Sequence, residues 1–152
     1  MNRSVPWERL VEAEDAYFER RQEMFEAGMD RELGLALQSA KGRGMALRVL
    51  RELPPDAILP HVGVVADIAT RTHGQVGLAR EVLSKVDRDA AIRLVVPQIE
   101  AMLAADADWE TYRRSAEVLV MLGARGALSH LVSLALKSDD ADIREVGEDF
   151  GS

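Results

Sequence analysis

The chain has no cysteine among its 152 residues, which excludes disulfide bridges, thiolate zinc sites and thiol catalysis. Aromatic residues are scarce, at 5% of the chain. No apolar run approaches the roughly 18 residues that a membrane span needs. The first ten residues also lack the apolar core of a signal peptide. We therefore expect a soluble, cytoplasmic protein, and we interpret its arginine and alanine bias as that of a GC-rich bacterial genome.

The residues that are present indicate one globular domain over 1–152. Apolar residues make up 47% of the chain and charged residues 30%, a balance typical of folded rather than disordered proteins. The net charge of −7 is unevenly distributed along the sequence. It amounts to −4 over residues 1–40, +2 over 41–104 and −5 over 105–152. The acidic character therefore belongs to the two ends of the chain.

Apolar residues recur with helical spacing along almost the whole sequence, and no segment alternates as a strand would. Glycine, aspartate and serine interrupt this pattern every 12–18 residues, as expected at helix ends. The interruptions predict about nine helices, and the short connections make successive helices antiparallel neighbours. The predicted ranges are 6–27, 30–40, 43–53, 56–71, 74–86, 88–104, 108–122, 124–137 and 140–149.

A block of eight residues repeats along these predicted helices. Segments 76–83, 112–119 and 143–150 align without gaps, and each opens and closes on an apolar or aromatic residue. A weaker copy occupies 43–50, so that the four blocks end 33, 36 and 31 residues apart. The sixth position of the three clear copies is always glutamate: Glu81, Glu117 and Glu148. A further helix precedes each clear copy, and prolines recur there 37 residues apart, at Pro60 and Pro97.

This pattern resembles the HEAT repeat, in which an antiparallel helix pair stacks on its neighbours. The arginines that follow the opening residue in two blocks, Arg113 and Arg144, match the HEAT pattern, whereas Gly44 and Gly77 replace them in the other copies. The resemblance implies an all-α fold, a short right-handed α-solenoid of antiparallel helix pairs. Residues 43–150 would form the repeats, and the N-terminal helices within 1–42 would cap the stack, because one pair cannot bury its apolar face alone.

In HEAT-like stacks the second helices of the pairs line the concave face, so the resemblance places their charged residues there. Recognition on such a preformed surface loses little conformational freedom. We therefore expect a non-catalytic protein-interaction module, either an adaptor, a scaffold or an inhibitor of the immunity-protein type. The candidate partner-binding residues on this face are Arg80, Glu81, Arg113, Arg114, Glu117, Arg144, Glu145 and Glu148.

The predicted helix at 6–27 provides a second candidate surface. Its large apolar residues come in adjacent pairs that repeat every seven residues: Leu10-Val11, Tyr17-Phe18 and Met24-Phe25. A stripe of this kind could cap the first repeat, dock a protein partner, or pair with a second copy to form a homodimer. All three alternatives stay open here, with capping the simplest. The partner-binding candidates on this helix are Trp7, Tyr17, Phe18 and Phe25.

Little in the sequence points to chemistry. The histidines, His61, His73 and His130, lack the spacing of metal ligands, and no nucleophile or phosphate-loop motif is present. We expect no catalytic residue, no metal and no cofactor. The alternative is a HEAT-like DNA glycosylase or another nucleic-acid-binding repair protein. A surplus of two positive charges over 41–104 is small for a DNA-binding surface, so nucleic acid is not the expected partner.

Overall fold

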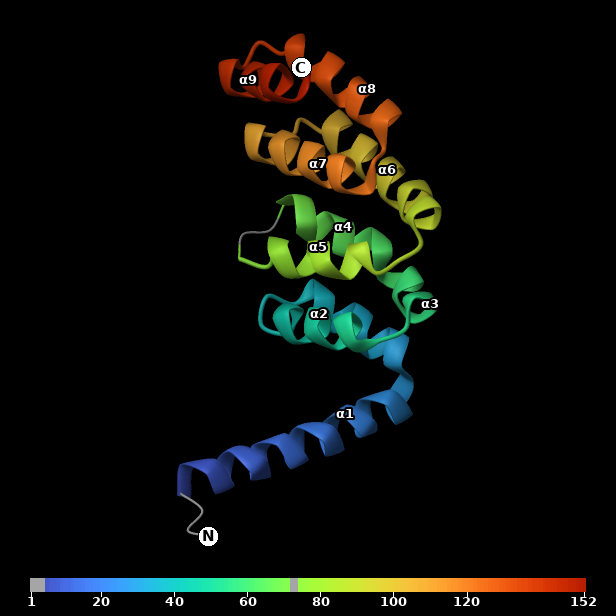
Figure 1. Ribbon diagram of the computed structural model, residues 1–152, viewed down its shortest axis with the longest axis vertical. Coiled ribbons are helices and arrows are strands. Elements are labelled where there is room, and N and C mark those ends of the chain that lie inside the picture. The colour runs from blue at the N-terminus through green and yellow to red at the C-terminus, as the bar shows by residue number, and fades with distance from the viewer. Residues whose placement is uncertain (1–4, 72–73) are drawn as a thin grey trace. The chain divides into compact units, whose positions relative to one another are not determined.

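The computed structural model describes residues 5–71 and 74–152, and within these ranges all regular secondary structure is helical (Figure 1). This confirms the all-α fold that the sequence predicts. The elements are α1 (Val5–Gln38), α2 (Arg43–Glu52), α3 (Pro55–Ile58), the 3₁₀ helix η1 (Leu59–His61), α4 (Val62–Arg71), α5 (Val76–Ser84), α6 (Arg88–Ala104), α7 (Trp109–Leu122), α8 (Arg125–Leu136) and α9 (Ala141–Phe150).

These boundaries agree with the predicted ones to within a few residues, apart from two local differences. The break predicted near Gly28 is present as one non-helical residue, with φ of 110° and ψ of 84°, inside the continuous span of α1. Glycine adopts this backbone conformation without the steric cost of a Cβ. The predicted helix at 56–71 is interrupted by η1, which contains Pro60. Proline has no N–H for the α-helical hydrogen bond, and the chain tightens into a 3₁₀ turn there.

Three of the predicted helix starts are built by aspartate side chains. Asp87 accepts a hydrogen bond from the backbone N–H of Ala90 at 3.0 Å, and Asp108 accepts one from Thr111 at 2.8 Å. Asp140 caps α9 in a similar way, through the N–H two residues on. Each cap satisfies a donor that the first turn of a helix leaves free, which explains why α6, α7 and α9 begin at these positions.

The chain divides into two compact units, one that extends up to Leu35 and one that covers 36–152. The first contains most of α1. The second contains helices α2 to α9 and the larger part of the buried apolar core. This division falls several residues before position 42, where the repeat pattern placed the end of the N-terminal helices.

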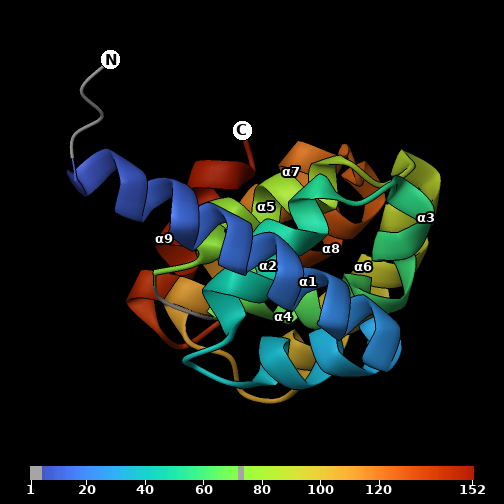
Figure 2. The same cartoon turned by 90° about the horizontal axis from the view of Figure 1, so that it is seen from below.

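Within residues 36–152 the helices pack as successive pairs. α4 packs on α5, α6 on α7 and α8 on α9. The second helices of these pairs also touch in order, from α2 to α5, from α5 to α7 and from α7 to α9, so they form one layer. Figures 1 and 2 show α3, α6 and α8 on the other side of this unit. Stacked helix pairs are therefore present, while membership of a HEAT-like family stays a prediction.

The closing residues of the repeated blocks lie in the core of this stack. Leu50 and Leu83 are fully buried, and Leu119 is 1% exposed. Phe150 closes the last block and is only half-buried; α9 instead buries Ile143 and Val146. The block alignment therefore identifies core positions correctly in the inner pairs and less well in the terminal one.

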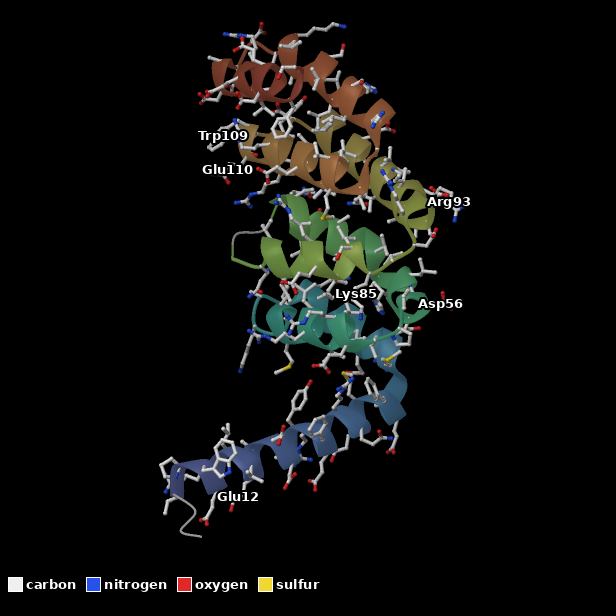
Figure 3. The ribbon with its side chains drawn as sticks, viewed as in Figure 1. Glu12, Asp56, Lys85, Arg93, Trp109 and Glu110 are labelled. Atoms are coloured by element: carbon white, nitrogen blue, oxygen red, sulfur yellow. The ribbon has the colours of Figure 1, made fainter. Side chains whose placement is uncertain are left out.

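Basic side chains bind the C-terminal ends of two helices, α2 and α7, in the layer formed by the second helices. The Lys85 ammonium, labelled in Figure 3, donates to the backbone carbonyls of Arg51 and Leu53 at the end of α2. Arg88 Nε donates to the carbonyl of Leu122 at the end of α7, at 2.7 Å. Positive charge at a helix C-terminus is favourable because unpaired carbonyls carry partial negative charge there. These contacts link neighbouring pairs through their backbones.

Truncation of a block-closing leucine should destabilise the stack. We expect Leu83→Ala and Leu119→Ala each to lower the free energy of unfolding by about 2–5 kcal/mol, because each leaves a cavity in a buried contact. Leu94, which is 44% exposed, is the matched control, and its change to alanine should have little effect. Urea unfolding followed by circular dichroism measures the difference, and equal losses at buried and exposed sites would contradict the repeat register.

Substitution of Gly123 should also destabilise the stack. Gly123 ends α7 with a φ of 69°, and a Cβ there would lie 1.6 Å from Nη2 of Arg88. Gly123→Ala should therefore cost about 1–2 kcal/mol, from left-handed backbone strain and from the displaced Arg88 hydrogen bond. Gly126, in the first turn of α8 with open space around it, is the control, and its change to alanine should be neutral or slightly stabilising. Thermal unfolding of both variants measures this.

Candidate functional site

The charged candidates from the sequence lie on the second helices of the stack. Two belong to α5, three to α7 and three to α9, and these helices contact one another in that order. They therefore share one layer of the unit formed by residues 36–152. In this order they are Arg80, Glu81, Arg113, Arg114, Glu117, Arg144, Glu145 and Glu148.

Four of these eight side chains form ion pairs with the neighbouring helix. Arg80 on α5 pairs with Glu117 on α7, and Glu81 on α5 pairs with Arg51 on α2 at 3.2 Å. Arg113 on α7 pairs with Asp149 on α9 at 2.6 Å. We call these three contacts the inter-helix ladder. Each rung joins one second helix to the next along the layer.

The ladder was not foreseen in the sequence, although all of its members were visible there. Its rungs join residues 30, 37 and 36 positions apart, close to the repeat length. The arginine nevertheless lies at a different place relative to its block in each rung: Arg51 follows the block 43–50, Arg80 is the fifth residue of 76–83, and Arg113 is the second residue of 112–119. Aligning the blocks position by position therefore hides the pairing. The spacing of opposite charges at about one repeat length would have been the signal.

Ion pairing limits what this layer can offer to a partner. Arg114 adds a pair within α7, to Glu110 at 3.8 Å, and Arg113 also lies over the ring of Phe150 at 5.9 Å. A guanidinium that already faces a carboxylate must give up that contact before it can bind another anion. The ion pairs of this layer therefore have a structural role first, because each rung fixes the position of one helix against the next.

A polar hollow lies between α5 and α7 and brings four of the candidates together. Its cavity volume is about 270 Å³, and its lining combines arginine and glutamate side chains with one aromatic ring. Trp109 contributes that ring from the first turn of α7, is 41% exposed, and is labelled beside Glu110 in Figure 3. The lining residues are Val76, Arg80, Trp109, Glu110, Arg113, Arg114 and Glu117.

The candidates on α9 behave differently from those on α7. Arg144 donates through Nη1 to the backbone carbonyl of Ser138 at 2.8 Å, so it binds the connection between α8 and α9. Glu145 and Glu148 are exposed, as is Asp142 in the first turn of the same helix. The last helix of the chain therefore presents carboxylates to solvent, as the acidic C-terminal segment of the sequence suggests.

The apolar residues of the N-terminal helix form the most exposed candidate surface. Trp7 is 57% exposed, Leu10 59% and Phe18 53%. Tyr17 and Phe25 are half-buried. The seven-residue repeat of the pairs places all of them along one side of α1, in a continuous stripe. We call this surface the N-terminal stripe, which comprises Trp7, Leu10, Val11, Tyr17, Phe18, Met24 and Phe25.

Local contacts order the stripe within α1. Tyr17 and Phe18 meet edge to face with their ring centroids 5.4 Å apart. The guanidinium of Arg21 lies over the ring of Phe25, 5.1 Å from its centroid. Both contacts hold aromatic rings against the helix and shield part of their area. The stripe runs from Trp7 to Phe25 and ends before Gly28, where the backbone leaves the helical conformation.

An apolar groove between α6 and α8 was missed in the sequence. Its cavity volume is about 280 Å³, and it is lined by side chains of both helices together with Tyr112 and Leu119 of α7. A neighbouring hollow of about 410 Å³ shares Val96 and Ala127 with it. Burial raises the pKa of the Tyr112 phenol, which forms part of the wall of the groove. Apart from Glu100 and His130, the lining residues of the first groove fit an apolar helix face, and only the spacing between helices distinguishes a groove from a core.

The histidines do not gather into a site. His61 is buried within η1 and His130 is exposed at the rim of the groove, while His73 lies outside the described residues. In residues 5–71 and 74–152, no three histidine, aspartate or glutamate side chains are grouped as a metal site would require. None of the helices in the described part of the chain combines the length and apolarity needed to cross a bilayer.

No protein-family model matches the chain, and the curated proteins and solved structures yield no match either. A function is therefore inferred from the residues and their geometry.

The ladder should show measurable coupling between its partners. A double-mutant cycle on Arg80→Ala and Glu117→Ala should give about 0.5–1 kcal/mol, because both side chains are partly shielded, with exposures of 27% and 38%. The coupling should fall as salt is added. The cycle on Arg51 and Glu81, with exposures of 45% and 59%, is the control and should give less. Equal coupling in both cycles would show that shielding does not set the strength of a rung.

Proposed function

We propose that this protein is a non-catalytic protein-binding module, and that the N-terminal stripe is its binding surface. The observation that carries this proposal is the exposure of Trp7, Leu10 and Phe18 along one side of a single helix. Large apolar side chains that are exposed together, rather than singly, mark interaction surfaces in most proteins. Aromatic residues are also over-represented at the energetic centres of such surfaces.

The energetics favour a bound state for this stripe. Burying one large apolar side chain contributes about 1.5–3 kcal/mol, so three or four of them can offset the loss of freedom on association. Acidic residues such as Glu8 and Asp15, three and four positions from Val11, are exposed on the same helix and would lie at the rim of the contact. An apolar centre with a charged rim is the usual composition of a specific protein interface.

The other candidate surfaces support the proposal less well. In the layer of second helices, Arg80, Arg113 and Arg114 each face a carboxylate. These three guanidinium groups are therefore already paired and do not attract an acidic partner. The same pairing weakens the nucleic-acid alternative, which requires arginines that neutralise phosphates. We propose that the stack of residues 36–152 acts as a rigid support. The ladder would then contribute stability rather than recognition.

A pull-down with a disrupted stripe tests this function. The full chain is immobilised and exposed to a lysate of its source organism, alongside the variant Phe18→Glu. We expect a protein that the wild-type chain retains in stoichiometric amount and that the variant loses, since a carboxylate cannot be buried unpaired at an apolar contact. Mass spectrometry identifies what is retained, including a second copy of this chain.

The control substitution is Leu94→Glu. Leu94 is exposed to a similar degree, 44% against 53% for Phe18, but lies on α6 in the other unit. Its variant should retain the same protein as the wild-type chain. If Phe18→Glu retains as much as the wild type, or if the wild type retains nothing specifically, the stripe is not a binding surface.

A further inference from the structure

The N-terminal stripe has a symmetric pattern that specifies its partner more closely. Three positions seven residues apart lie along its midline, Trp7, Glu14 and Arg21, and Gly28 continues the series. The apolar pairs flank this midline, with Leu10, Tyr17 and Met24 on one side and Val11, Phe18 and Phe25 on the other. Residues seven positions apart lie almost on one line along the surface of a helix. Residues three or four positions further on lie to one side or the other of that line.

From this pattern we infer that the stripe binds a second copy of itself, antiparallel, with the two-fold axis between positions 17 and 18. The inference rests on the proposed function, because it names the partner of the same surface. In this register, two residues of different copies lie level with one another when their numbers add up to 35. Residue 14 of one copy, for example, lies level with residue 21 of the other. The two-fold symmetry makes every such contact occur twice.

The charges on the midline match in this arrangement. Glu14 of one copy meets Arg21 of the other, and Arg21 meets Glu14 in turn. A parallel pair in register would place Glu14 against Glu14 and Arg21 against Arg21, which is repulsive at both levels. A polar pair inside an apolar seam fixes orientation and register more than it adds affinity. The midline therefore selects the antiparallel pair.

The apolar layers match in size as well. Tyr17 meets Phe18 at the centre of the pair, with Leu10 opposite Phe25 and Val11 opposite Met24 on each side. Every flanking position thus meets another apolar residue. At the ends, Trp7 lies opposite Gly28, where no side chain competes for the space and a Cβ would have no neighbour within 4 Å. The bulkiest residue of the stripe thus lies opposite a glycine.

The side of α1 opposite this seam is acidic. Glu12 is exposed, lies on the opposite side of α1 from the midline, and is labelled in Figure 3. From Val5 to the residue before Gly28 the helix spans about 34 Å, long enough for a seam of several layers. The stripe occupies residues 7–25 of this length, so the two copies would contact one another along most of it.

The mass of the full chain in solution is the first test. We expect sedimentation equilibrium to give twice the chain mass of 16.8 kDa, with dissociation to monomer on dilution. A monomer at every concentration would overturn the inference. If the pull-down nevertheless recovers a different protein through Phe18, the proposed function stands and only the identity of the partner changes.

Charge reversal on the midline tests orientation and register. Glu14→Arg places the introduced guanidinium against Arg21 of the other copy at both symmetric levels, and should weaken the dimer about tenfold or more. The double variant Glu14→Arg with Arg21→Glu restores opposite charges and should recover most of the affinity. In a parallel pair the single reversal exchanges one like-charge contact for another and leaves the affinity unchanged. That result would overturn the antiparallel arrangement.

The matched control is Glu12→Arg, which makes the same change of charge on the opposite side of the helix. It should leave the dimer intact, which separates a local contact from the effect of net charge. Circular dichroism confirms that each variant keeps its helical content. If Glu12→Arg and Glu14→Arg weaken the dimer equally, the midline contact does not exist.

Discussion

Each helix pair in residues 36–152 leaves an apolar face that only the next pair can cover, and the rest of this unit depends on that constraint. Leu83 and Leu119 close equivalent blocks in successive pairs and are both buried. The ion pairs of the inter-helix ladder and the basic caps at Lys85 and Arg88 join the same neighbours. Apolar burial provides the attraction, while these polar contacts fix how far one helix slides along the next.

Sequence reasoning succeeded where a single residue decides the local structure. Asp87, Asp108 and Asp140 start helices by capping, and the block-closing leucines are core, because both effects depend on the residue type at one position. It failed where two distant elements decide together. The ladder changes block position from rung to rung, and the groove between α6 and α8 depends on the distance between helices. Neither property belongs to one segment of the chain.

The two units use the same residue types in different ways. In residues 36–152, leucine and valine side chains are buried in a shared core. Along the first part of α1, aromatic and aliphatic side chains stay exposed in a single stripe. Most of the stability of a helix in a protein comes from packing of its apolar face rather than from its own backbone. The proposed pairing would give the N-terminal helix the burial that the stack gives to the others.

The carboxylates exposed on α9 have a consequence for contacts between copies of the chain. Asp142, Glu145 and Glu148 would oppose one another if the α9 helices of two copies met, and like charges at close range repel. Contact between two α9 helices is therefore disfavoured, whereas the proposed contact through α1 brings opposite charges together and, being two-fold, would close at a pair.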